Sequence, residues 1–113
     1  MTEAKKGENR VNYVRERLPA ENKIYDLAEF FKVFGDSTRA KILSCLEVCE
    51  LNVSEIAEAL NMSVSAVSHQ LRILRSAKLV KVSKRGKQAV YALDDDHVTQ
   101  IIECGLSHIE ERD

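Results

Sequence analysis

Two short helical patterns follow each other with almost no connecting chain, and this arrangement restricts the fold more than any other feature. The first, SEIAEALN, begins at Ser54, a suitable N-cap, and ends at Asn61, a residue type that tolerates left-handed backbone. The second, SVSAVSHQLRILRSAKL, begins at Ser63. Its apolar stripe consists of Val64, Val67, Leu71 and Leu74. A connection of about three residues between two helices is typical of a helix-turn-helix.

A hairpin pattern follows this pair of helices. The segment LVKVSKRGKQAVYAL alternates apolar and polar residues on both sides of KRGK (residues 84–87), which predicts two antiparallel strands with a cationic tip. Helical patterns also occupy residues 22–35 and 36–50, and a last helix begins in the aspartate run 94–96 and ends near Glu111. The predicted order α-α-α-α-β-β-α is mostly α with a β-hairpin wing, a winged helix-turn-helix.

The length and composition suit one domain in a reducing environment. We expect residues 1–20 to form an N-terminal arm, partly disordered or a short helix, and residues 21–113 to form the DNA-binding and dimerisation domain. Cys45, Cys49 and Cys104 contain no CxxC pair and argue against a disulfide framework. Because no apolar stretch approaches the length that spans a bilayer, we expect a cytoplasmic protein that has no membrane partner.

The net charge of −1 hides a strong separation of charge along the chain. Residues 61–93 contain no Asp or Glu, yet they include seven Lys and Arg residues. From residue 94 to the C-terminus the balance is inverted, with seven acids and one arginine. This pattern predicts that one end of the fold binds a polyanion and the other binds a cation.

The second helix of the pair carries side chains suited to double-stranded operator DNA. Its polar face offers short hydroxyls, a methyl group that permits close approach, and two groups able to bond purine edges, Gln70 and Arg72. The expected reading residues are Ser63, Ser65, Ala66, Ser68, His69, Gln70 and Arg72. The wing residues Lys84, Arg85 and Lys87 are expected on phosphates, where they add affinity without sequence information.

The last helix holds two histidines eleven residues apart, His97 and His108. At 3.6 residues per turn they share a face, but they lie roughly 16 Å apart along the axis, too far for one metal ion. Two antiparallel copies would bring His97 of one chain beside His108 of the other. In that register Ile101 faces Cys104, so a homodimer would also gain a continuous apolar seam.

Two acids complete a ligand set in this arrangement. Glu111 lies three residues after His108 and shares its face, and Asp95 precedes His97 at the start of the helix. Asp95 and His97 of one chain, with His108 and Glu111 of its partner, make four nitrogen and oxygen ligands. Such a set suits tetrahedral zinc, with cobalt as a substitute.

The chain resembles the ArsR/SmtB family of metal-sensing repressors, from about Tyr25 to Glu111. The resemblance rests on FGDSTRAKIL, VSHQLRILRSAKLVKVSKRGK and YALDDDHV, and D-x-H-x10-H-x2-E looks like that family's zinc site on the C-terminal helix. It implies a homodimer that represses its operator when metal-free and releases it when zinc binds. Relatives that sense softer metals carry an ELCVCD-like stretch, whereas this chain reads ELNVSE, with Asn52 and Ser54 in place of the thiols.

Two other functions remain open at this stage. A thiol-based repressor, sensing redox state or a soft metal, would use Cys45, Cys49 or Cys104, and it would need an accessible thiol of low pKa. A zinc hydrolase would need an open coordination position for water, which a four-ligand seam does not leave. We therefore expect a regulator that is not an enzyme and has no small-molecule substrate.

Overall fold

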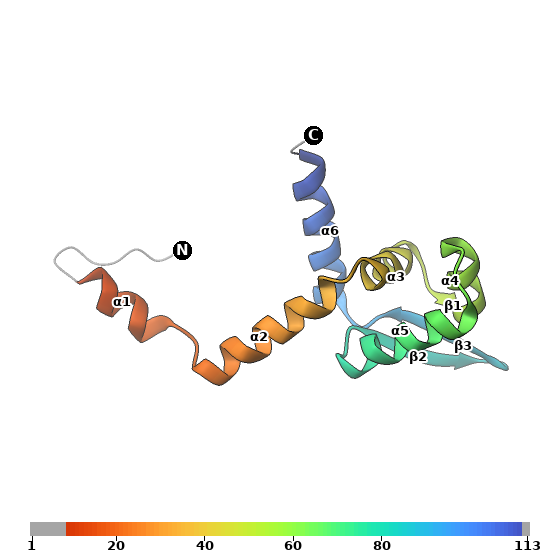
Figure 1. The fold of residues 1–113 in the computed structure, drawn as a ribbon, viewed down its shortest axis with the longest axis horizontal. Coiled ribbons are helices and arrows are strands. Elements are labelled where there is room, and N and C mark those ends of the chain that lie inside the picture. Colours follow the sequence, from red (N-terminus) through yellow and green to blue (C-terminus); the bar gives the residue numbers. More distant parts are fainter. Residues whose placement is uncertain (1–8, 112–113) are drawn as a thin grey trace. The chain divides into compact units, whose positions relative to one another are not determined.

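The computed structural model describes residues 9–111, and Figure 1 shows their helices and strands. In chain order the elements are α1 (Arg10–Arg17), α2 (Glu21–Phe34), α3 (Ser37–Val48), β1 (Leu51–Asn52), α4 (Val53–Leu60), α5 (Val64–Ser76), β2 (Val80–Arg85), β3 (Gln88–Leu93) and α6 (Asp96–Glu111). From α2 onward this is the predicted order with one short strand, β1, added. Among the described residues, no helix combines the length and the apolar character that crossing a membrane requires.

Two compact units make up the chain, Met1–Phe30 and Phe31–Asp113. In the first unit, residues 1–8 of the expected arm lie outside the described residues, and α1 forms where a short helix is predicted. The side chain of Asn9 caps α1 by accepting from the backbone N–H of Val11 at 2.8 Å. The guanidinium of Arg17 lies 3.5 Å from the centre of the Tyr13 ring, which covers that ring.

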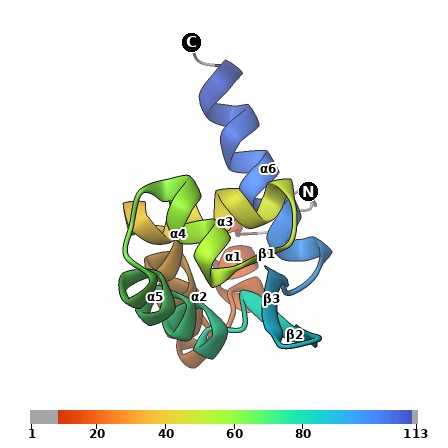
Figure 2. The same cartoon turned by 90° about the vertical axis from the view of Figure 1, so that its right-hand side faces the viewer.

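The second unit is built around the helix-turn-helix and its wing. Helices α3, α4 and α5 pack on one another, and β3 pairs with β2 on one side and with β1 on the other (Figure 2). The largest fully buried side chains come from these helices and from the two residues where the chain enters β2, namely Ile42, Leu43, Ile56, Val67, Leu71, Leu74, Leu79 and Val80. The core therefore fixes α5 against α3 and α4.

The connections of this unit match the predicted ones with one correction. Asn61 ends α4 in left-handed backbone, with φ 54° and ψ 46°, and Ser63 caps α5 as expected. The correction concerns the hairpin, where residues 84–87 were expected between the strands. The turn consists of Gly86 and Lys87 alone, because Arg85 still pairs with Gln88. Gly86 has φ +64°, which suits glycine at the first central position of a two-residue turn.

The expectation that Ser54 caps α4 is wrong, because Asn52 does so. The Asn52 side chain accepts from the Glu55 N–H at 2.8 Å, and the Glu55 carboxylate accepts from the Asn52 N–H at 2.9 Å. Residue 52 is also the last residue of β1, which pairs Leu51 with Tyr91. This long-range pairing makes Asn52 the last extended residue. Helix α4 therefore begins at Val53, before Ser54.

We expect Asn52→Ala to lower the free energy of unfolding by about 1 kcal/mol, because it removes a reciprocal cap. The matched control is Ser54→Ala, which changes an exposed residue within the first turn of α4 and should alter stability little. Urea denaturation of both variants measures the difference. A larger loss for Ser54→Ala than for Asn52→Ala would contradict the assignment of the cap.

Candidate DNA interface and metal-binding residues

Helix α5 turns a polar face away from the core. The Oγ of Ser63 accepts from the Ala66 N–H at 3.1 Å and fixes where the helix begins. Because Val67, Leu71 and Leu74 are buried, residues on the opposite side point outward. The expected reading residues that are exposed are Ser63, Ser65, His69 and Arg72.

Three of the expected reading residues are less exposed. Ala66, Ser68 and Gln70 are half-buried, and the Gln70 Oε1 accepts from Arg39 Nη1 at 3.5 Å. Val64, which the apolar stripe places in the core, is 52% exposed, so that part of the stripe is wrong. Val64 is the first residue of α5, where the rest of the unit leaves about half of its surface exposed.

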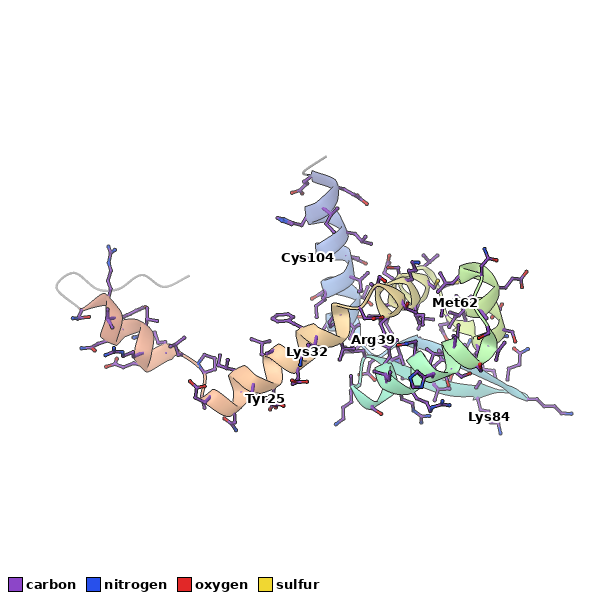
Figure 3. The ribbon with its side chains drawn as sticks, viewed as in Figure 1. Tyr25, Lys32, Arg39, Met62, Lys84 and Cys104 are labelled. Carbon is purple, nitrogen blue, oxygen red and sulfur yellow. The ribbon has the colours of Figure 1, made fainter. Side chains whose placement is uncertain are left out.

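The wing presents cations that differ in their surroundings. Lys84 and Lys87 are exposed at the far end of the hairpin, and Figure 3 labels Lys84. In contrast, the Arg85 guanidinium donates to the Glu50 carboxylate at 2.6 Å. Glu50 lies before the acid-free stretch and reaches the wing because β1 places residues 51 and 52 against β3. Arg85 therefore carries a charge that is already balanced within the chain.

We expect the two wing cations to contribute unequally to the salt dependence of DNA binding. Lys84→Ala should reduce the slope of log K against log salt by about 0.9, because one counterion-releasing contact is lost. Arg85→Ala should reduce it less, because Glu50 competes with phosphate for that guanidinium. Glu50→Gln is the complementary variant and should increase the slope. Fluorescence anisotropy of a labelled duplex at several salt concentrations measures all three, and an unchanged slope for Lys84→Ala would exclude the wing from the interface.

At the other end of the unit, Asp95 and His97 lie together at the start of α6. The Asp95 Oδ1 accepts from the backbone N–H of His97 at 2.9 Å and lies 3.4 Å from His97 Nδ1. Although desolvation alone would raise the pKa of Asp95, hydrogen bonds from the Val98 and His97 backbone and from the His97 side chain lower it below its ordinary value. Asp95 thus offers an ionised oxygen next to an exposed imidazole.

His108 and Glu111 lie at the other end of the same uninterrupted helix. Helix α6 runs from Asp96 to Glu111 without a break at Gly105, and both residues are exposed. Within residues 9–111 of one chain, no three His, Cys, Asp or Glu side chains form a group able to hold a metal ion. The chain therefore brings together one pair of the predicted ligands and keeps the other pair a helix length away.

The three cysteines differ in their surroundings. Burial, and then the nearby Cys49, raise the pKa of the Cys45 thiol above its ordinary value. A raised pKa keeps this thiol protonated, whereas metal binding and redox sensing both need the thiolate. Cys49 and Cys104 are exposed. These surroundings disfavour the thiol-based alternative at Cys45.

Comparison with known proteins identifies the family. Residues 36–82 match the model of the family described as bacterial regulatory protein, arsR family. A transcriptional repressor SmtB homolog from Synechocystis is 39% identical over 103 residues, which are 91% of this chain and 78% of that protein. The chain belongs to the arsR family. A cadmium resistance regulatory protein CadC homolog from Staphylococcus aureus is 37% identical over 105 residues, covering 92% of this chain and 86% of that protein.

Solved structures of similar proteins share the fold. The antimony-specific repressor AntR superposes with a TM-score of 0.74 at 30% identity, over 84% of this chain and 86% of that one. A homodimeric winged helix-turn-helix domain from Mycobacterium bovis gives 0.76 at 23% identity, over 85% and 92%. The predicted winged helix-turn-helix and the resemblance to ArsR/SmtB metal-sensing repressors are confirmed. This arsR-family chain is a DNA-binding transcriptional regulator and not an enzyme.

Two contacts beside the candidate DNA-binding residues of this arsR-family chain escape sequence reasoning. Glu50 is 35 residues from Arg85, and Arg39 is 31 residues from Gln70. No local pattern connects either pair, because each contact depends on how separate elements pack. A charge complementary to the basic stretch, at the residue just before a strand, is the only sequence signal that points to Glu50.

Proposed function

We propose that this protein is a zinc-responsive repressor, which binds operator DNA as a metal-free homodimer and releases it when zinc binds between the C-terminal helices. The observation that carries the proposal is the layout of α6. Asp95 and His97 form a pair at one end, His108 and Glu111 lie at the other end, and the helix between them is continuous. One chain supplies two half-sites, and an antiparallel partner supplies the complementary halves.

Exposed apolar surface on α6 supports a dimer formed through this helix. Val98 is its one buried residue, while Leu106 and Ile109 are 42% and 60% exposed. An apolar groove of about 300 Å³ runs between α6 and the α2–α3 region, lined by Phe31, Phe34, Ala40, Ser44, Ile101, Ile102, Gly105, Leu106 and Ile109. Large exposed apolar residues gathered on one helix mark an interaction surface. The homodimeric relative from Mycobacterium bovis is consistent with this assembly.

The helical positions leave the metal ligands on a face of their own. At roughly 100° per residue, His97, Ile101, Cys104, His108 and Glu111 fall within about 40° of one direction. The groove residues of α6 centre about 110° away from it, and only Ile101 belongs to both sets. A partner helix on the first face would therefore meet the ligands, and the exposed apolar residues of the second face, Leu106 and Ile109, would be covered by other parts of the partner chain.

The donor atoms favour zinc over cadmium, the softer metal that appears in the name of the CadC relative. Two imidazoles and two carboxylates give a borderline to hard set that fits tetrahedral zinc and accepts cobalt. A soft-metal site at the start of α4 would need thiols. The residues at those positions are Asn52, which caps the helix, and Ser54, which carries a hydroxyl group. The four side chains would replace water around zinc across the seam, and Asp95 would hold the neighbouring His97 in position.

At the DNA end, α5 would enter the major groove with its exposed residues Ser65, His69 and Arg72 on base edges. Lys84 and Lys87 would lie along the flanking phosphates. The DNA-binding and zinc-binding groups lie on different elements of the same unit. Zinc can therefore release DNA only by favouring a dimer arrangement in which the two α5 helices no longer match the groove.

Anisotropy of labelled promoter DNA tests the proposal directly. Metal-free protein should bind the duplex, and added zinc should release it. The visible spectrum of the cobalt-loaded protein separates the ligand sets, because tetrahedral nitrogen and oxygen ligation gives intense visible bands without thiolate charge transfer. A thiolate band that persists in His97→Ala would establish the thiol-based repressor instead.

A further inference from the structure

The first turn of α5 stands free of the rest of the second unit. Ser63, Val64 and Ser65 are exposed in succession, although successive residues of a helix point about 100° apart. Leu71, two turns further on, points within about 20° of the direction of Val64, yet it is 1% exposed whereas Val64 is 52% exposed. Figure 3 labels Met62 in the turn that leads into this end of the helix. The packing that buries one side of α5 therefore does not reach its first turn.

Val64 is an apolar residue that the fold itself uses little. Its neighbours Ser63 and Ser65 are polar, and the Ser63 Oγ already caps the helix by accepting from the Ala66 N–H. A β-branched residue is a poorer helix former than alanine, so helix propensity does not favour valine here. A single exposed valine on an ordinary surface needs no explanation. This one lies at the leading end of the helix proposed to read DNA.

The position of Val64 limits what it can meet in DNA. The N-terminal residues of the second helix of a helix-turn-helix contact base edges in the major groove. That groove is about 12 Å wide, close to the 10–12 Å diameter of a helix with its side chains, so sideways-pointing residues lie against its sides. With Ser65 toward the bases, Val64 points about 100° away, toward one side of the groove. The thymine C5 methyl is the apolar group that base pairs expose in this groove.

We infer that Val64 reads the C5 methyl group of a thymine in each half of the operator. The inference rests on α5 being the DNA-reading helix of the proposed function, and it adds an apolar contact to the polar ones. Valine forms no hydrogen bonds, so a cytosine amino group held against it would lose water without gaining a partner. Val64 therefore favours thymine by attraction to its methyl group and disfavours cytosine by desolvation.

Replacing thymine by deoxyuridine removes this methyl group and keeps every hydrogen-bonding group of the base pair. A selection from a randomised duplex library with metal-free protein supplies the test duplex, and anisotropy is measured for duplexes that carry one replacement each. At one position in a half-site, the replacement should weaken wild-type binding about fourfold, the effect of one buried methyl group. Val64→Ala should bind the unmodified duplex more weakly and should lose the deoxyuridine effect at that position, because the contact is already absent.

The matched control is Val48→Ala. Val48 is a 79% exposed valine at the end of α3, so the same side-chain change is made away from α5. This variant should keep both the affinity and the deoxyuridine effect of the wild type. Because Val64 is exposed and alanine is the better helix former, Val64→Ala should fold as the wild type does, and circular dichroism checks this.

The outcomes that overturn the inference are specific. Wild-type binding that ignores every deoxyuridine replacement would overturn it, and so would deoxyuridine effects that all persist in Val64→Ala. A loss of affinity in Val64→Ala without any deoxyuridine effect would place Val64 on deoxyribose, which would also overturn the reading of thymine.

His69→Ala separates failure of the inference from failure of the proposed function. If His69→Ala alters base preference while the deoxyuridine effects do not depend on residue 64, α5 reads DNA and only the role of Val64 is wrong. If neither His69→Ala nor Val64→Ala alters base preference, α5 is not the reading helix. The DNA part of the proposed function then fails together with the inference.

Discussion

Replacing His97 by alanine is expected to give a repressor that binds its operator normally but no longer releases it with zinc. Zinc can weaken DNA binding only through its differential affinity for the arrangement that binds DNA poorly. Loss of one of four ligands should reduce that affinity, and with it a coupling that in such systems is about 1–3 kcal/mol, or about 5–150-fold. Because His97 belongs neither to helix α5 nor to the wing, DNA binding without zinc should be unchanged.

The control for His97→Ala is a protein with all three cysteines replaced. Cys45 and Cys49 lie on or just after α3, and Cys104 lies on the ligand face of α6. The cysteine-free protein should respond to zinc nearly as the wild type does, with some loss of dimer stability from Cys104. Both proteins are compared in one anisotropy titration. A cysteine-free protein that ignores zinc, beside a responsive His97→Ala, would show that the sensor is a thiol.

Mixing two inactive variants is expected to restore zinc binding. In a homodimer of His97→Ala or of His108→Ala, both shared sites are damaged. In the mixed dimer one site carries both substitutions and the other site carries none, because each site takes one histidine from each chain. Statistical mixing of a two-fold dimer should therefore recover about a quarter of the wild-type sites at wild-type affinity.

Equilibrium dialysis of the mixture and of each variant alone measures this recovery. Sites built within one chain would give no recovery, because every chain in the mixture lacks one histidine. The wild-type protein should bind two zinc ions per dimer, and a single ion per dimer would also contradict the shared site. The matched control is a mixture of His97→Ala with a His97→Ala/His108→Ala chain, which should recover nothing.

Sequence patterns predict the elements of this fold well where the governing contacts are local. The start of α5 at Ser63, the left-handed end at Asn61 and the hairpin turn at Gly86 each depend on a few neighbouring residues. The ligand spacing on α6 is local in the same sense, because helical periodicity alone puts His97 and His108 on one face. These features follow from the order of residues without knowledge of the packing.

The features that sequence patterns miss depend on pairing between distant segments. Asn52 caps α4 in place of Ser54 because β1 pairs with β3, where Asn52 lies opposite Val90, 38 residues further along the chain. Arg85 is neutralised by Glu50, and Gln70 is held by Arg39, through contacts between separate elements. A pattern read along the chain identifies each of these residues as polar, but it cannot show which polar residues meet.

The junction between β3 and α6 has a consequence for how such a protein can diversify. β3 ends at Leu93, α6 begins at Asp96, and the backbone N–H of Asp94 donates to the Leu79 carbonyl at 2.9 Å. The strand that forms half of the wing therefore continues into the helix of the ligands with almost no slack. Residues added at this junction would leave the wing and α6 folded. The orientation of α6 relative to the wing would then no longer be fixed. Changes of ligand along α6, which keep its length, leave this connection intact, so selection can alter the metal without rebuilding the DNA-binding end.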